Sequence, residues 1–403
     1  MEGAPSPERD RDLRRWPLLG LLSLAMSLGM TPWLVSSALS PHFSAALGLG
    51  PGELGWLSTI VQLGFVVGTA GSALLNLPDL VPGRVLFGLS ATLVAVSNAS
   101  VMLAGRYPGA LASRFMTGFF LAGVYPPAMK MVSTWFRAGR GLAIGTLVGS
   151  LVVGKATPWL AHSAAGSNGR TLLLAASLAA LASGLLVVLF YRDGPYPFPR
   201  RPFSLGLVRK VLGHRETRLA IAGYLGHMWE LYAMWVWLPA FLAASSAGRL
   251  SSGTVDALSF TALACGGLGS VWGGWFADRR GRAITVNLSM AASGGCALLI
   301  GVFFGGSFWV LTPLAFIWGF FVVADSAQFS AMVTESAPPE AAGTALALQT
   351  SLGFLLSMVT LQAVPEIVAA KGWPWAFPGL SIGPALGIVA IRRLSRTGSP
   401  GGR

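Results

Sequence analysis

The sequence predicts an all-α integral membrane protein with about twelve transmembrane helices in two pseudo-symmetric six-helix halves. Composition is the first reason. The 403 residues are 53% hydrophobic and 11% charged, with a mean hydropathy of +0.65, whereas a soluble domain carries about 25% charged residues. The other two reasons are the number of long apolar runs and the repeat of short motifs on either side of a polar gap at mid-chain.

A spanning helix needs roughly 20 mostly apolar residues, and a helix satisfies its own backbone hydrogen bonds in lipid. The predicted spans are 16–40, 53–77, 84–105, 109–133, 141–163, 170–191, 218–243, 255–277, 283–304, 307–333, 343–364 and 373–391. They divide the chain into a tail (1–15), a first half (16–191), a central loop (192–217), a second half (218–391) and a second tail (392–403). Tryptophans near the predicted span ends, Trp33 among them, indicate anchoring at the membrane interface.

The formal net charge of +13 comes from Lys and Arg residues that lie mostly in the gaps on one side of the predicted spans. The gaps on the other side hold only Arg106, Arg170, Arg249 and Lys371. By the positive-inside rule, both tails are predicted to be cytoplasmic in a multi-pass protein of the plasma (inner) membrane. This distribution follows the bilayer and argues against binding of nucleic acid, although the chain is basic.

Residues for metal or enzyme chemistry are scarce. Cys265 and Cys296 lie within apolar runs and indicate neither a disulfide framework nor a metal site. Four scattered histidines supply no nucleophile or metal cluster, and no phosphate-binding glycine-rich loop with a lysine is present. We therefore expect no enzymatic activity, no cofactor and no metal, and an ion gradient instead of ATP as the energy source.

A short charged turn separates the eighth and ninth predicted spans. Its characteristic residues are Gly274, Asp278, Arg279, Gly281 and Arg282. A weaker copy, with Asp79 and Arg84, follows the second span about 200 residues earlier in the chain. The turn resembles the loop signature of the major facilitator superfamily, a glycine and a few apolar residues followed by Asp-Arg-x-Gly-Arg.

This resemblance implies a secondary carrier that works by alternating access, with the charged turns as a gate on the cytoplasmic side. In that family the loop Asp faces the start of the fifth helix of a half when this side is closed. If the same contacts form in this chain, we expect Asp278 to face the helix that begins at Gly343. We expect Asp79 to face the helix that begins at Gly141. The partial positive charge of a helix N-terminus stabilises a carboxylate there.

Three basic residues lie within predicted spans, where a charge is costly and marks a functional site by default. Arg114, with Gly118 four residues later, resembles a second signature of the same family in the fourth helix. Lys155 lies deep in the fifth span, and both cations are predicted to face one cavity and bind an anionic group of the substrate. Lys130 is a third candidate for substrate binding. For each, the alternative is a long side chain that reaches the membrane interface.

The seventh predicted span carries the densest polar cluster, with Tyr224, His227 and Glu230. His227 and Glu230 are three residues apart and so share a helix face. Burial disfavours a charged carboxyl, and we therefore predict Glu230 as the proton-coupling residue, with His227 as relay or substrate ligand. The alternatives are a structural hydrogen-bonded pair, or a salt bridge from Glu230 to a base in the membrane.

Further polar residues lie in the tenth and eleventh spans. Asp325 is predicted either as a second proton site or as a partner for Lys130. Gln349 and Tyr224 are predicted to line the substrate cavity, although polar packing between helices is the commoner use of such residues.

We therefore predict a monomeric secondary active transporter, embedded in the lipid bilayer, that moves a small organic solute and is coupled to protons. The intramembrane bases favour an anionic group on that solute. A proton-driven exporter of drugs or metabolites is the alternative within this class. A membrane-embedded solute sensor or scaffold is the alternative in another class, although no gap is long enough for a soluble output domain.

Overall fold

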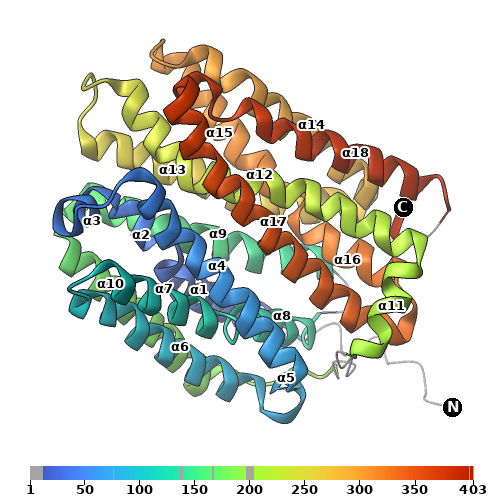
Figure 1. Ribbon diagram of the computed structural model, residues 1–403. Helices are drawn as coiled ribbons and strands as arrows, with labels where there is room; N and C mark the ends of the chain where they lie inside the picture. The colour runs from blue at the N-terminus through green and yellow to red at the C-terminus, as the bar shows by residue number, and fades with distance from the viewer. Residues whose placement is uncertain are drawn as a thin grey trace, which may run out of the picture.

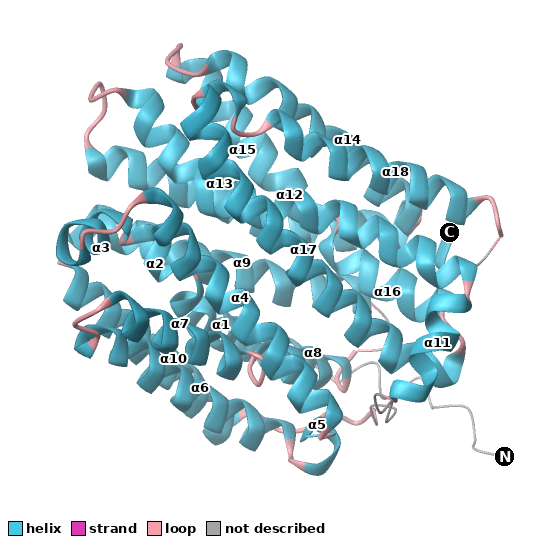
Figure 2. Cartoon of the chain, in the orientation of Figure 1, coloured by secondary structure: helices cyan, strands magenta, loops and turns pink. Residues whose placement is uncertain are grey.

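The protein is all-helical in the parts that the structure describes (Figure 1). The computed structural model describes residues 12–75, 77–136, 139–165, 168–196, 204–398 and 400–402. Across these ranges Figure 2 shows helices joined by short loops, with no strand. The all-α fold class that the sequence predicts is confirmed.

The helices before the central loop are α1 (Arg15–Met30), α2 (Val35–Ala38), α3 (Ser40–Leu47), α4 (Pro51–Leu74), α5 (Leu77–Leu80), α6 (Gly83–Ser100), α7 (Tyr107–Leu121), α8 (Tyr125–Ser133), α9 (Arg140–Ala165) and α10 (Gly169–Phe190). The later helices are α11 (Leu205–Gly213), α12 (Arg215–Ser246), α13 (Ser252–Arg280), α14 (Arg282–Leu299), α15 (Phe308–Ala324), α16 (Ser326–Ser336), α17 (Ala342–Lys371) and α18 (Ile382–Ser395). A short 3-10 turn, η2 (Thr31–Trp33), joins α1 to α2.

Contacts between helices fall into two groups, which we call the first half (α1–α10) and the second half (α12–α18). In the first half α1 packs on α9 and α10, α4 packs on α7, and α6 packs on α7 and α10. In the second half α12 packs on α17 and α18, α13 packs on α15, and α14 packs on α15 and α18. Two pairs of long helices join the halves: α9 with α13, and α4 with α17.

We call the end of the bundle where α1 begins and α18 ends the terminal end, and the opposite end, which carries α3, the distal end (Figure 1). Helix α11 lies at the terminal end, where Lys210 forms an ion pair with Glu340. The predicted central loop thus contains a helix. It is tied to the second half as well, because the backbone N–H of Ser204 donates to Thr344 Oγ1 at 3.1 Å.

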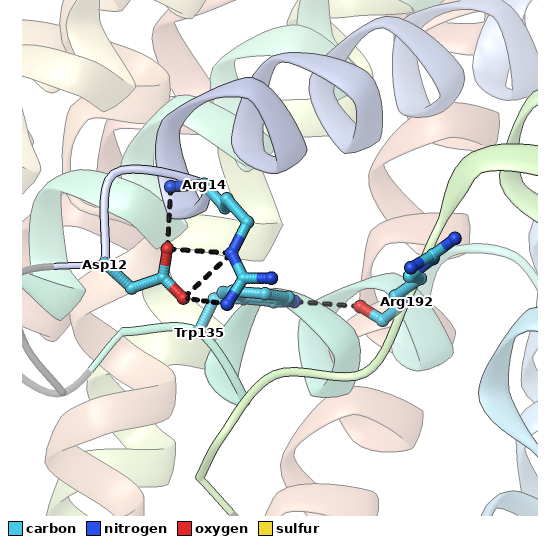
Figure 3. A network of polar contacts seen from close by, with 4 residues as sticks. All are labelled: Asp12, Arg14, Trp135 and Arg192. Atoms are coloured by element: carbon cyan, nitrogen blue, oxygen red, sulfur yellow. Dashed lines mark hydrogen bonds and ion pairs between the residues drawn. The ribbon is translucent and has the colours of Figure 1, made fainter.

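Side chains also fasten the start of α1 and the end of α8 at the terminal end (Figure 3). The indole N–H of Trp135 donates to the backbone oxygen of Arg192, just after α10, at 3.0 Å. Arg14 pairs with Asp12 at 2.9 Å, and its hydrogen bonds hold the pKa of the Asp12 carboxyl below its usual range. Trp135 belongs to the buried core, whereas Arg14 is exposed.

Nine stretches in the described ranges are long and apolar enough to cross a membrane. The predicted first, fourth and seventh spans are not among them, so twelve spans are not confirmed by length and composition. The first is interrupted at Pro32, which lies in the turn η2. The fourth is split between α7 and α8, where Pro126 and Pro127 follow Tyr125. The seventh, α12, is 32 residues long but contains the charged and polar residues discussed below.

Large apolar side chains cover the outside of the bundle. Leu178 is 63% exposed and Leu268 is 68% exposed, and similar side chains are exposed on α6, α14 and α18. Exposed apolar surface on this scale marks a face that contacts something other than water. Together with the nine apolar spans, it indicates a bundle solvated by lipid.

Candidate functional site

Lys155 lies at the contact between the two halves. It belongs to α9, is 3% exposed, and its Nζ donates to Oη of Tyr232 on α12 at 2.7 Å. The Trp33 ring centroid lies 3.6 Å from Nζ, and the rings of Tyr232 and Trp235 lie at 4.9 and 5.0 Å. A desolvated ammonium is attracted to aromatic faces. The predicted alternative, in which Lys155 reaches the membrane interface, is wrong.

The aromatic rings around Lys155 come from both halves. Trp33 stacks on Tyr232 at 5.9 Å, and Phe354 of α17 packs against Trp33 at 5.8 Å and Tyr232 at 5.3 Å. Phe65 of α4 lies 4.8 Å from Phe354. We call the whole set the lysine cage: Trp33, Phe65, Lys155, Tyr232, Trp235 and Phe354. Within the described ranges, Lys155 forms no ion pair with a carboxylate.

Arg114 is fully buried in the first half, with its guanidinium directed at backbone oxygens. Nη1 donates to the carbonyl of Pro32 at 2.9 Å and to Asn98 Oδ1 at 3.0 Å, and Nη2 donates to the carbonyl of Trp33 at 2.7 Å. These carbonyls lie at the break after α1, where the last C=O groups of a helix lack donors from their own helix. Arg114 thus supplies the donors that the interrupted first span needs.

Arg114 and Lys155 therefore do not converge on one cavity as predicted. Trp33 lies between them, because Arg114 binds its carbonyl and Lys155 lies over its ring. The predicted alternative for Arg114, a side chain that reaches the interface, is also wrong, since its burial is complete. One cation is held inside its own half, and the other lies where the halves meet.

Glu230 lies inside the second half. It is 1% exposed, and Oε1 accepts a hydrogen bond from Trp318 Nε1 on α15 at 2.6 Å. Oε2 accepts one from Ser293 Oγ on α14 at 2.8 Å. Both donors are neutral, so the predicted alternative of a salt bridge to an intramembrane base is wrong.

His227, one turn earlier on α12, has different partners. Its Nδ1 lies 2.9 Å from Asp325 Oδ1, and its Nε2 lies 3.0 Å from Ser326 Oγ. Asp325 Oδ1 accepts no properly directed hydrogen bond among the described residues, so the contact acts as an ion pair when His227 is protonated. The predicted pairing of Asp325 with Lys130 is wrong. The reason is that the break between α15 and α16 turns Asp325 toward α12, in its own half.

Of the remaining candidates for substrate binding, Tyr224 lies next to His227, whereas Gln349 and Lys130 lie on other helices. The Tyr224 ring lies 6.0 Å from the ring of His227 and 5.8 Å from Phe329. Gln349 is buried on α17, and its Oε1 has no hydrogen-bond partner in the described ranges. A buried acceptor left unpaired is costly, which keeps Gln349 a candidate for a hydrogen bond to substrate. Lys130 lies half-buried in the last turn of α8.

A match to a known family covers most of the chain. Residues 21–361 match the Major Facilitator Superfamily. The chain belongs to the major facilitator superfamily. It is therefore a multi-pass membrane transporter that acts on a small molecule. No curated protein matches the chain. In the described ranges, no three His, Cys, Asp or Glu side chains gather as metal ligands.

The charged turn of this major facilitator transporter lies at the terminal end, between α13 and α14. Gly281 has a φ of +89°, in the region that favours glycine. Arg282 Nη1 donates to Glu335 Oε1 on α16 at 2.7 Å. The guanidinium carbon of Arg279 lies 4.1 Å from the ring centroid of Trp275.

Asp278 of this turn lies against the start of α9 in the first half. A Cβ added at Gly141 would lie 2.8 Å from Asp278 Oδ2, and one added at Gly274 would lie 2.5 Å from the carbonyl oxygen of Gly141. The prediction that Asp278 faces the helix beginning at Gly343 is wrong. Helix α13 packs along α9, whereas α17 packs along α4, so the turn after α13 reaches the other half of the transporter.

Small residues continue this contact along α9 and α13. A Cβ added at Gly145 would lie 2.6 Å from the carbonyl oxygen of Ser270, and one added at Gly149 would lie 2.6 Å from that of Gly267. These glycines allow the two helices to approach closely, because any side chain would collide with backbone.

The first-half copy of the turn is described only in part. The side chain of Asp79 lies outside the described parts of the structure, and so does its predicted contact with α9. The backbone around it forms the short helix α5. Arg84 is exposed in the first turn of α6.

Polar contacts between the halves also close the distal end. They join His162 to Asp256 at 2.6 Å, Thr59 to Gln362 at 2.8 Å and Gln62 to Ser357 at 2.7 Å. Nearer the terminal end, α4 and α17 leave a cavity of about 230 Å³, with Thr69, Leu348 and Ser351 in its lining. The α4–α17 contact is thus tight distally and looser toward the terminal end.

Several residues of the site were missed from the sequence. Trp33 was expected at the membrane interface, but it is 2% exposed, because it lies in the turn η2 and packs against Lys155, Phe65 and Tyr232. A proline in the middle of an apolar run was the available signal. Asn98, Ser293 and Trp318, which bind Arg114 and Glu230, carry no sequence signal that separates them from ordinary packing residues.

Proposed function

We propose that the protein is a secondary active transporter that moves a small organic anion by alternating access, coupled to protons. The observation that carries the proposal is the lysine cage, in which a buried ammonium has one hydroxyl and three aromatic rings but no carboxylate partner among the described residues. A buried charge is costly unless it is paired. An anionic group on the substrate is the partner that Lys155 lacks.

The position of Lys155 supports a role in the transport cycle. Lys155 comes from the first half, whereas Tyr232, Trp235 and Phe354 come from the second. In alternating access the two halves move relative to each other around a central site. Separation of α9 from α12 breaks the Nζ–Oη hydrogen bond to Tyr232 and leaves the ammonium for an anion. Substrate and cage therefore compete for the same cation.

Glu230 is the proposed proton site, with His227 and Asp325 as a second titratable pair. No cation faces Glu230 among the described residues, and both of its oxygens accept hydrogen bonds from neutral donors. Uptake of a proton removes a buried charge at the cost of rearranging one of these bonds. His227 Nδ1 and Asp325 Oδ1 lie 2.9 Å apart in the same half, so a proton gained or lost by this pair changes the charge next to Tyr224.

Transport into proteoliposomes tests the proposal. Uptake is measured for a panel of small carboxylates and for neutral and cationic solutes of similar size, with and without a proton gradient. We expect carboxylates to be carried, and K155Q to lower their uptake about tenfold or more, as expected for loss of a charged hydrogen-bonding group. The matched control is K371Q, since Lys371 is exposed at the distal end of α17.

Two results would reject the anion-binding role. The first is uptake of neutral or cationic solutes with no carboxylate carried. The second is carboxylate uptake by K155Q at the rate of K371Q. A thermal-shift screen with the same panel reports binding without transport, and a carried carboxylate should stabilise the wild type and K371Q but not K155Q.

A further inference from the structure

A polar hollow lies at the terminal end of the second half, away from the lysine cage. It has a volume of about 530 Å³ and lies between the start of α12 and the end of α18. Its lining is Arg215, Glu216, Arg393, Arg396 and Thr397. Neither the transport proposal nor the gate uses these residues.

The charge of this hollow is positive and uncompensated. Arg215, Arg393 and Arg396 are exposed, and none of their side chains makes a hydrogen bond or ion pair in the described ranges. Glu216 is the single acid of the lining, and its Oε2 lies 3.0 Å from His214 Nε2. Three guanidiniums therefore face one carboxylate that already has a partner. Arginine binds phosphate with two parallel hydrogen bonds, so this is a donor set suited to a phosphate group.

The hollow borders the exposed apolar face of α18. Ile382, Leu386 and Val389 are 55%, 65% and 46% exposed, which places them on the outer apolar surface of the bundle. Arg393 and Arg396 follow at four and seven residues after Val389, and residues at this spacing lie on one helix face. The lipid-facing stripe of α18 thus ends in the two arginines of the hollow.

Helix α12 adds to the same charge. It begins at Arg215, and its N-cap residue His214 supplies no side-chain cap. A helix N-terminus carries partial positive charge and favours anions. Arg218 and Arg392 are exposed next to the hollow on the same two helices and extend the basic surface.

We propose that this hollow binds the phosphate of an anionic phospholipid headgroup at the terminal-end surface of the membrane. The three arginines bind the phosphate, and the acyl chains lie along the apolar stripe of α18. Inorganic phosphate could bind the arginines in the same way, but it has no acyl chains. The apolar stripe of α18 therefore favours a phospholipid as the source of the phosphate group. Binding there would tie α12, which carries the cage residues Tyr232 and Trp235, to α18 and the lipid.

Native mass spectrometry of the delipidated, full-length protein tests the proposal. The probes are phosphatidylglycerol, phosphatidylcholine with the same acyl chains, and inorganic phosphate alone. We expect a preference for phosphatidylglycerol over phosphatidylcholine, and a loss of about fivefold in this preference for each arginine removed, or roughly a hundredfold in R215Q/R393Q/R396Q. The preference should weaken as ionic strength rises.

The control variant is R192Q/R209Q/R280Q, which removes the same charge from exposed arginines that do not line the hollow. This control should keep the wild-type preference for phosphatidylglycerol over phosphatidylcholine. In R393Q alone, the preference should be about fivefold lower than in the wild type. Both triple variants should unfold at the wild-type temperature, since all six side chains are exposed. Three outcomes overturn the proposal: no preference in the wild type, equal loss in the control, or displacement of the lipid by an equal concentration of inorganic phosphate.

Discussion

The region around Arg114 and the region around Lys155 each bury a cation in the first half, but they satisfy it in different ways. Arg114 has three oxygen acceptors, all from its own half. Lys155 has one hydroxyl, and that hydroxyl and two of its three rings belong to the other half. A cation that is satisfied within a half moves with it as one body. A cation that is satisfied across the contact changes partners whenever the halves separate.

The acids of the second half extend this comparison. Glu230 accepts two hydrogen bonds from within its own half, and Asp325 faces His227 in that half as well. By the same reasoning, neither acid has to meet the substrate. This separation suits proton binding, in which a small ion reaches a site that a solute does not.

Removing Arg114 should have the largest effect on stability. R114A leaves the carbonyls of Pro32 and Trp33 and the amide oxygen of Asn98 without donors in an apolar interior, which we expect to cost about 3 kcal/mol of unfolding free energy. K155M keeps an apolar side chain of similar length and leaves only the Tyr232 hydroxyl unpaired. We expect it to cost about 1 kcal/mol or less.

Unfolding of both variants in the same detergent measures this difference. R114K, which keeps the charge but not the planar fork, should fall between wild type and R114A. Equal losses of stability in R114A and K155M would show that the two cations do not differ in the way their contacts indicate.

Replacing Glu230 should affect coupling more than stability. E230Q keeps the shape of the side chain but has only one acceptor oxygen for the two donors, at a cost of about 1 kcal/mol. Because the amide binds no proton in the working pH range, we expect proton-driven accumulation to be lost while exchange of solute across the membrane continues.

Flux into proteoliposomes with and without a pH gradient gives both quantities. The control is E366Q, at an exposed acid near the distal end of α17. Accumulation by E230Q at the level of E366Q would remove Glu230 from the proton path and leave His227 and Asp325 as the candidates.

Replacing Asp278 should have the smallest effect, because it changes a contact at the surface end of α9. A carboxylate at a helix N-terminus contributes about 0.3–1 kcal/mol. We therefore expect D278N to shift the balance toward opening at the terminal end by about two- to fivefold. A cysteine at Ala347, which lines the cavity between α4 and α17, should react faster with a water-soluble thiol reagent in this variant.

The matched variant at the distal end is D256N, which weakens the contact with His162. It should slow labelling of the same cysteine by favouring opening at the opposite end. Equal labelling in wild type, D278N and D256N would mean that these contacts do not set the balance between the two open states.

Much of the fold could be predicted from the sequence, because lipid imposes local rules. Long apolar runs must be helices in a bilayer, and the charged turn after α13 identifies the family from five residues. The depth of Lys155 and Glu230 within their spans also follows from local position, since each lies about two turns or more from the nearest predicted span end. Pro32 and Pro126 are present in the sequence at the two helix breaks. The sequence alone did not show that the first and fourth predicted spans would be interrupted there.

Which groups meet depended on the tertiary structure. Lys155 and Tyr232 are 77 residues apart in the chain, and Glu230 and Trp318 are 88 apart. No helix periodicity predicts such pairs, because they depend on which faces of α9, α12 and α15 pack together. The sequence alone determined that buried charges exist and roughly how deep they lie. Packing alone decided that Arg114 binds the carbonyls of Pro32 and Trp33, that Asp278 lies against α9 of the other half, and that Lys155 lies at the contact between the halves.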